Sequence, residues 1–311
     1  MKVRVLVTCL VVSVTANVAG LLLLMPAMIE RLDPVRNEMA RRLEILLPPG
    51  AASSSLSARI ERRIFVSHVD GQTDVFGLLR PDLNISQTNF KLVVYLHGMG
   101  SSYLEPFFIP AGVAVADGIV SSHPDTVLIS PSYRREASWG NDTAMADITQ
   151  NIREVCQEFP VKKIVLMGTS MGGCTVLAYA AAAPADIKAK LAGVVSVESA
   201  GDLFALYNES VHPRLKQAMT SAFGGSPSEV PELYKRKSFL SNVDGLPKGV
   251  RVAVISARQD IVVPAQLQRD IVAALEKHQV AVKLIEIDGG HQAPPLKTYL
   301  EGYDFVVPVG T

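Results

Sequence analysis

The pentapeptide Gly168-Thr169-Ser170-Met171-Gly172 places a serine in a setting that suits nucleophilic chemistry. The apolar run before it, Lys163 to Met167, predicts a buried strand, and the alanine-rich run after it predicts a helix through Ala183. Flanking glycines permit a strained strand-to-helix turn that lifts the serine above the sheet, and the helix N-terminus favours negative charge there. We therefore predict that Ser170 is the nucleophile of an acyl-transfer reaction, with a purely structural serine turn as the alternative.

A serine hydroxyl is a poor nucleophile without a base to accept its proton. The chain has six histidines, and His291 is our candidate for this base. It follows the last predicted strand, Lys283 to Ile287, through the tight turn Asp288-Gly289-Gly290. This context predicts that His291 lies at the same edge of the sheet as Ser170.

The third catalytic group should be an acid that orients the histidine. Asp260 is our candidate because it closely follows the predicted strand Val252 to Ile255. Its alternative role is that of a turn or helix-capping aspartate. Glu198, Asp202 and Asp288 are rival acids, although Asp288 is too close in sequence to His291 to be its default partner.

The segment His97-Gly98-Met99-Gly100 follows the predicted strand Leu92 to Leu96. We predict that the backbone N–H groups of Met99 and Met171 stabilise the oxyanion of a tetrahedral intermediate. A plain glycine turn is the alternative for this loop. The cysteines, histidines and carboxylates show no metal-ligand spacing, so we expect neither a metal nor another cofactor.

Short apolar runs alternate with helical stretches over most of the chain, and this alternation predicts the elements that position the catalytic groups. The further predicted strands are Val127 to Ile129 and Gly193 to Val197, and an antiparallel hairpin around Asp70-Gly71 comes first. We expect an α/β fold with a mainly parallel central sheet and helices on both faces. The long segment from Ser199 to Gly249 is expected to be a cap-like insertion over the active-site face.

The region from about Ile64 to Pro295 resembles the α/β-hydrolase superfamily, particularly its esterase and prolyl-oligopeptidase-like branches. The nucleophile turn, the loop at His97 and the chain order Ser170, Asp260, His291 carry this resemblance. It implies a serine hydrolase that cleaves carboxylic esters, with a small peptidase, amidase or thioesterase as the alternative enzyme. Too few residues precede the hydrolase region for a propeller domain, which counts against peptidase activity. A catalytically silent binding module is the alternative outside enzymes.

Three residues are candidates for the substrate pocket. Within the resemblance, Trp139 lies where pocket residues often occur, although ordinary packing explains a tryptophan equally well. Phe204 and Tyr207 belong to the expected insertion and could cover a hydrophobic acyl pocket, or else pack the insertion onto the domain. The expected substrate is a small-molecule or lipid-like ester.

An uncharged run from Val5 to Ile29 follows Lys2 and Arg4 and, as a helix of 25 residues, would span about 37 Å. We expect residues 1–30 to form a single-pass membrane anchor, with a cleaved signal sequence or a buried helix as alternatives. Residues 31–55 then form a juxtamembrane helix and a linker, and the catalytic domain covers residues 56–311. We expect this domain on the extracytoplasmic side, although four arginines after the run oppose a simple orientation rule: Arg31, Arg36, Arg41 and Arg42.

The 311 residues carry 30 basic and 30 acidic side chains, so the net charge at pH 7 is zero. No long-range field therefore favours a polyanion, and we expect no nucleic-acid partner. The oligomeric state stays open at this level.

Overall fold

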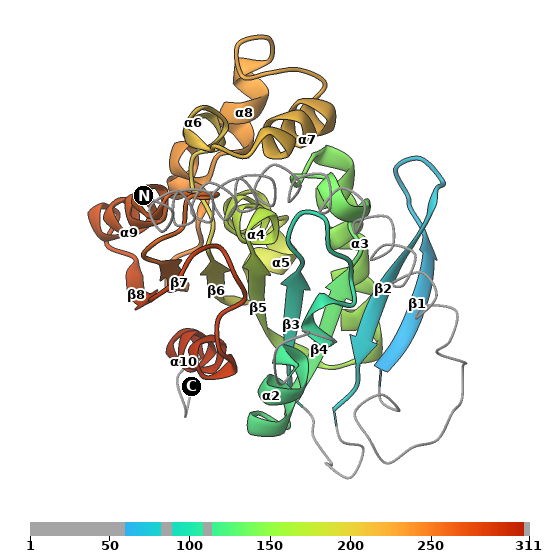
Figure 1. Ribbon diagram of the computed structural model, residues 1–311. Coiled ribbons are helices and arrows are strands. Elements are labelled where there is room, and N and C mark those ends of the chain that lie inside the picture. The colour runs from blue at the N-terminus through green and yellow to red at the C-terminus, as the bar shows by residue number, and fades with distance from the viewer. Residues whose placement is uncertain (1–59, 82–88, 108–113, 308–311) are drawn as a thin grey trace, which may run out of the picture. The chain divides into compact units, whose positions relative to one another are not determined.

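The computed structural model describes residues 60–81, 89–107 and 114–307, all of which belong to one unit of the chain, Ser55–Thr311 (Figure 1). The predicted membrane anchor, juxtamembrane helix and linker lie outside these residues. Within the described ranges, no helix combines the length and the apolar character that crossing a bilayer requires.

The unit is built on one eight-stranded sheet with the order β1-β2-β4-β3-β5-β6-β7-β8. The first two pairs, β1 with β2 and β2 with β4, are antiparallel, and all later pairs are parallel. The mainly parallel sheet and the opening hairpin are therefore confirmed. The strands are β1 (Ile60–Val66), β2 (Thr73–Leu79), β3 (Phe90–Leu96), β4 (Thr126–Pro131), β5 (Val161–Thr169), β6 (Leu191–Val197), β7 (Arg251–Ala257) and β8 (Ala281–Ile287).

Both faces of the sheet are covered because the central strands are apolar on both sides. In β3, Leu92 and Val94 pack into one core, whereas Val93 and Tyr95 pack into the other. The first core includes side chains of α3 (Asp142–Glu158), α4 (Met171–Ala182) and α9 (Ala265–Lys277). The second lies under α2 (Val115–Ser122) and α10 (Leu296–Val306), which lie together at the bottom of Figure 1. Short elements η2 (Glu105–Phe107), η3 (Arg135–Ala137) and α5 (Ala185–Lys188) occupy the connections.

The segment between β6 and β7 forms a helical insertion. It contains α6 (Leu203–Glu209), α7 (Pro213–Phe223), α8 (Pro231–Lys237), η4 (Phe239–Ser241) and η5 (Val243–Gly245). Figure 1 shows α6, α7 and α8 at the top, beyond the ends to which β3 and β5 point. Buried Tyr234 packs edge-on against Phe223, with ring centroids 4.8 Å apart, and gives the insertion an aromatic core.

Ion pairs and hydrogen bonds tie this insertion to the catalytic face. Lys237 is buried, and its Nζ lies 2.7 Å from a carboxylate oxygen of Asp142 at the start of α3. The hydroxyl of Ser210 donates to the carbonyl oxygen of Val262 at 2.8 Å, in the loop that follows β7. The insertion therefore contacts the loop that also carries Asp260.

Candidate active site

Four neighbouring parallel strands end at one edge of the sheet, and the chain places a chemically active side chain after each of them. Their registers pair Thr169 of β5 with Val197 of β6, and Ala257 of β7 with Ile287 of β8. The residues that follow these ends include Ser170, Glu198, Asp260 and His291. Ligands and catalytic groups gather at such carboxyl ends because the loops there converge.

Ser170 occupies the strained turn that the sequence predicts. Its backbone angles are φ 55° and ψ −118°, and it is the N-cap residue of α4. A positive φ is costly for a side chain other than glycine, so surrounding structure must hold it. Part of that support is close packing, because a Cβ on Gly172 would lie 2.0 Å from the carbonyl oxygen of Leu96. Likewise, a Cβ on Gly168 would lie 2.5 Å from the backbone of Gly172. Any larger residue at either position would therefore clash with backbone atoms.

Ser170, His291 and Asp260 form one continuous chain of hydrogen bonds. The Nε2 atom of His291 lies 2.9 Å from the hydroxyl oxygen of Ser170, and its Nδ1 lies 2.7 Å from Oδ2 of Asp260. Ser170 is half-buried and the side chain of His291 is 20% exposed, so solvent and substrate can reach the serine end. The arrangement can transfer a proton from Ser170 to a histidine whose orientation is fixed by a carboxylate.

Asp260 is held by three further donors. Its Oδ1 accepts the backbone N–H groups of Val262 and Val263, both at 2.9 Å, while Oδ2 also accepts Nε2 of Gln268 at 3.1 Å. Asp260 and Gln268 are both buried. These bonds leave Oδ2 directed at His291 and stabilise the ionised carboxylate.

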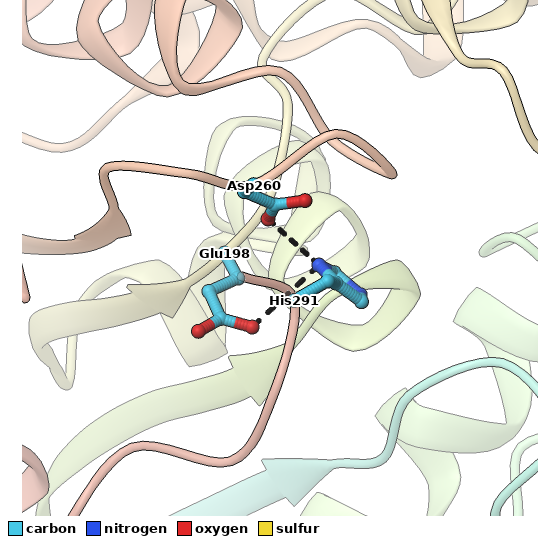
Figure 2. A group of neighbouring side chains, drawn as sticks. All are labelled: Glu198, Asp260 and His291. Carbon is cyan, nitrogen blue, oxygen red and sulfur yellow. Dashed lines mark hydrogen bonds and ion pairs between the residues drawn. The ribbon is translucent and has the colours of Figure 1, made fainter. Parts of the chain in front are cut away.

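Glu198 supplies a second buried carboxyl group next to the histidine. Its Oε2 lies 3.5 Å from Nδ1 of His291, and Figure 2 shows both carboxyl groups directed at that nitrogen. Burial, followed by the negative charge of Asp260, raises the pKa of Glu198 to about 8, against a smaller lowering by the backbone N–H of Gln292. At neutral pH this carboxyl group is therefore mainly protonated.

Glu198, Asp260 and His291 are also close enough to be considered as metal ligands, because their ligand-type atoms all lie within 4.8 Å of one another. However, Nδ1 of His291 is at hydrogen-bond distance from Asp260, and Nε2 faces Ser170. Both ring nitrogens are thus engaged, which fits proton transfer better than metal binding.

The other rival acids have structural roles. Asp202 is the N-cap of α6, where its side chain accepts the backbone N–H groups of Phe204 and Ala205. Asp288 is exposed and forms an ion pair with Arg258 at 2.6 Å. Among the rivals, Glu198 is thus the carboxyl group that contacts His291.

The loop after β3 lies beside the nucleophile. A Cβ on Gly98 would lie 3.6 Å from Cβ of Ser170, so the two backbones are in near contact. The N–H of Gly98 donates to Oε2 of Glu105 at 3.0 Å and is thus engaged elsewhere, which leaves Met99 as the better donor of this loop. Met171 begins α4, and the first N–H groups of a helix have no partner within it.

Buried His97 and Tyr133 brace that loop. The ring nitrogens of His97 lie 2.8 Å from the carbonyl oxygen of Gly98 and 3.3 Å from that of Ser132. The hydroxyl of Tyr133 donates to the carbonyl oxygen of His97 at 2.5 Å. These hydrogen bonds fix the position of the loop that carries Met99.

The three residues predicted to bind substrate lie in different surroundings. Trp139 is 2% exposed and has φ 49°, and its backbone N–H points at Sδ of Met171 at 3.4 Å. Tyr207 is half-buried and packs within the insertion, where its hydroxyl lies 3.3 Å from Oγ1 of Thr220. Phe204 is 46% exposed on α6. Trp139 thus lies against Met171, one of the two predicted oxyanion donors, and Phe204 offers an exposed apolar surface.

Sequence reasoning gave no role to Gln268 and treated Glu198 only as a rival acid. Glu198 had a usable signal, because it directly follows the predicted strand Gly193 to Val197 at the catalytic edge. Gln268 had none, since its contact with Asp260 depends on how α9 turns back onto the sheet.

Comparisons with known proteins give a family match and several structural matches. Residues 91–230 match the α/β hydrolase fold family. A puromycin-hydrolyzing peptidase of Mycobacterium tuberculosis aligns with TM-score 0.63 and 16% identity, over 82% of this chain and 40% of that chain. The fluorophosphonate-binding serine hydrolase FphF of Staphylococcus aureus gives 0.58 and 16%, over 79% and 93%. A ferulic acid esterase gives 0.57 and 13%, over 78% and 94%.

The chain therefore spans about two fifths of the length of the matched peptidase. No curated protein shows a significant sequence match. At these identities, the solved structures establish a shared fold and leave the substrate open.

Proposed function

We propose that this chain, an α/β-hydrolase-fold protein, is a serine hydrolase that cleaves carboxylic esters through an acyl-enzyme intermediate. The sheet order and the family match confirm the predicted fold. The observation that carries the proposed activity is the hydrogen-bond chain from Ser170 through His291 to Asp260. These residue types in this order are the parts that nucleophilic ester cleavage requires.

In the proposed first step, the oxygen of Ser170 attacks the ester carbonyl carbon while its proton moves to Nε2 of His291. The carbonyl electron pair moves onto oxygen and gives a tetrahedral oxyanion, which the N–H groups of Met99 and Met171 stabilise. As the intermediate collapses, the C–O bond to the alcohol breaks, and the alcohol leaves with the proton from His291.

In the second step, water attacks the acyl carbon of the acyl-enzyme and gives its proton to His291. Collapse of the second oxyanion releases the carboxylic acid, and Ser170 regains its proton from His291. Asp260 accepts the hydrogen bond from Nδ1 of His291 and stabilises the imidazolium that forms twice in each cycle. No cofactor takes part in these steps.

We favour ester cleavage over amide cleavage because this chain matches a solved esterase over most of the length of that esterase, but matches a solved peptidase over less than half of its length. The ferulic acid esterase aligns over 94% of its length, whereas the puromycin-hydrolyzing peptidase aligns over 40%. Phe204 is 46% exposed on the insertion, and we propose that it contacts an apolar or lipid-like acyl group. Amides and thioesters would use the same catalytic groups and are outcomes of the substrate test.

We further propose that the run Val5–Ile29 holds the protein in a membrane with the catalytic domain on the extracytoplasmic side. The support is the length and apolarity of the run. Extraction of membranes at alkaline pH should leave the full chain in the pellet. Release into the supernatant, with a new N-terminus near Asn17, would instead indicate a cleaved signal.

The test of the activity is fluorophosphonate labelling, followed by kinetics on matched ester and amide substrates. Wild-type protein should be labelled at Ser170 and should hydrolyse the esters faster. Ser170→Ala and His291→Ala should each lose nearly all turnover and keep the wild-type melting temperature. Ser241→Ala, which changes an exposed serine of the insertion, is the matched control and should behave as wild type.

Two results would contradict the proposal. Normal turnover by Ser170→Ala would remove the nucleophile from the mechanism. Failure of folded wild-type protein to react with fluorophosphonate would favour a binding module without catalysis.

A further inference from the structure

The position of Glu198 is energetically unfavourable for a residue with a carboxyl group. Its side chain is 1% exposed, and its Oε1 has no hydrogen-bond partner among the residues that the structure describes. The backbone is also unfavourable, because φ is 47° at a residue with a side chain. A neutral apolar residue would fill a buried space without the desolvation of a carboxyl group.

The local geometry directs this carboxyl group at the catalytic histidine. The N–H of Glu198 donates to the carbonyl oxygen of Ile255 at 2.8 Å, which fixes the residue at the end of β6. Its Oε2 then lies 3.5 Å from Nδ1 of His291, the nitrogen that Asp260 contacts at 2.7 Å (Figure 2). His291 thus faces two carboxyl groups on the side opposite to Ser170.

The groups around Glu198 come from each neighbouring element. Asp260 faces it from the loop after β7, while His291 and the N–H of Gln292 face it from the loop after β8. Tyr299 on α10 lies near enough for the charge of Glu198 to contribute to the raised pKa of its hydroxyl, which burial dominates. The cation that can form within this group is the imidazolium of His291.

We propose that Glu198 is a positioning residue and second acidic partner of His291, which stabilises the imidazolium formed when His291 takes the Ser170 proton. This inference rests on the proposed serine-hydrolase function. It adds a group that acts through His291 and does not itself touch the substrate. During catalysis the proton moves from Ser170 to Nε2 of His291, and Nδ1 keeps its own proton between the two carboxyl groups.

The charge of Glu198 makes this role dependent on pH. Its pKa of about 8 means that the carboxyl group is neutral near pH 6.5 and ionised near pH 9. The second partner therefore gains its full effect in the alkaline range, where it adds a negative charge beside the imidazolium.

Glu198→Gln separates charge from shape, since glutamine resembles the protonated form of glutamate in size and hydrogen bonding. The measured quantity is the second-order rate constant of fluorophosphonate labelling at Ser170 between pH 6 and 9.5. We expect the variant to match wild type near pH 6.5 and to fall roughly tenfold below it near pH 9. Asp288→Asn, which removes an exposed charge from the turn before His291, is the matched control and should follow wild type.

A double-variant experiment tests the partnership with Asp260. In Asp260→Asn, Glu198 remains as the carboxyl group beside Nδ1 of His291. Near pH 9, where Glu198 is ionised, adding Glu198→Gln to that background should therefore cost more than the roughly tenfold loss that the same change causes in wild type. Equal fractional losses in both backgrounds would indicate independent effects and overturn the shared role.

A readout without turnover separates this inference from the proposed function. The imidazole NMR resonances of His291 should show a step near pH 8, where Glu198 ionises, in wild type and not in Glu198→Gln, whether or not the protein is catalytic. If Glu198→Asp shows such a step again and regains the alkaline labelling rate, the charge is responsible. Absence of the step in wild type, or a loss in Glu198→Gln that is uniform over pH, would reduce Glu198 to packing. Wild-type protein that shows the step but is not labelled would refute only the hydrolase assignment.

Discussion

Replacement of Asp260 by asparagine should lower kcat strongly, because the hydrogen bonds around the carboxylate decide which way the amide group of the asparagine points. The oxygen of the asparagine can accept the N–H groups of Val262 and Val263, which both donate to Oδ1 in the native protein at 2.9 Å. The amide NH₂ then faces Nδ1 of His291 and selects the tautomer with the proton on Nε2. That nitrogen can no longer accept the proton of Ser170.

The magnitude follows from the cost of the opposite orientation. Turning the amide oxygen toward His291 restores the active tautomer and the acceptor for Nε2 of Gln268, but it leaves the two backbone donors without their acceptor. The net loss is one buried donor, which costs about 1 to 3 kcal/mol, so the active orientation lies higher by about that amount. At about 1.36 kcal/mol per tenfold in rate, kcat should fall by about 5-fold to 160-fold.

The assay is kcat for an activated ester, measured with the fraction of Ser170 that reacts with a fluorophosphonate. Asp202→Asn is the matched control, because Asp202 caps α6 and asparagine caps a helix equally well. We expect full activity and an unchanged melting temperature in that control. A loss of less than threefold in Asp260→Asn, or a comparable loss in Asp202→Asn, would refute the tautomer argument.

Three further predictions concern the packing, the pocket and the buried acid. Gly172→Ala should cost about 3 kcal/mol or more, a drop in Tm of roughly 6 to 12 °C, since its Cβ would lie 2.0 Å from a backbone oxygen. In Gly98→Ala the nearest atom would lie 3.6 Å from the new Cβ, so this control should have the Tm of wild type. If Gly172→Ala and Gly98→Ala had the same Tm, the packing argument would be wrong. Phe204→Ala should lower kcat/KM for long acyl esters more than for short ones, because each methylene in an apolar pocket contributes about 1 to 3 kcal/mol. Tyr207→Ala loses packing inside the insertion, so it should instead lower Tm and reduce kcat/KM equally for all esters. An equal loss for all esters in both variants would contradict the role of Phe204 in the pocket. Finally, the pKa of Glu198 is raised from 4.5 to about 8 in the folded protein, so its carboxyl group destabilises the fold progressively as pH rises through this range. The Tm of Glu198→Gln should therefore rise relative to that of wild type between pH 4.5 and about 8. A Tm difference that does not change with pH would show that Glu198 does not titrate in this range.

Local sequence was enough to predict the nucleophile turn and the strands that lead to the catalytic groups. The pattern at Ser170 is local, because a buried strand, two glycines and a helix determine a strained turn within a dozen residues. The order of Asp260 and His291 along the chain was informative for a similar reason. Each follows a short apolar strand, and parallel strands bring their carboxyl ends to one edge of the sheet.

The tertiary structure decided which groups meet at that edge and how they are held. Sequence favoured Asp260 over Glu198 but did not show that both carboxyl groups lie beside His291. Both residues follow neighbouring strands, and the difference between 2.7 and 3.5 Å from Nδ1 of His291 arises from loop conformation. The support of Asp260 by Gln268, and that of the Met99 loop by Tyr133, depends on contacts between segments far apart in the chain. Hydrophobic periodicity determines which face of an element is buried. It carries no information about the distance between two polar side chains, because that distance is determined only when all the strands, helices and loops around them pack together.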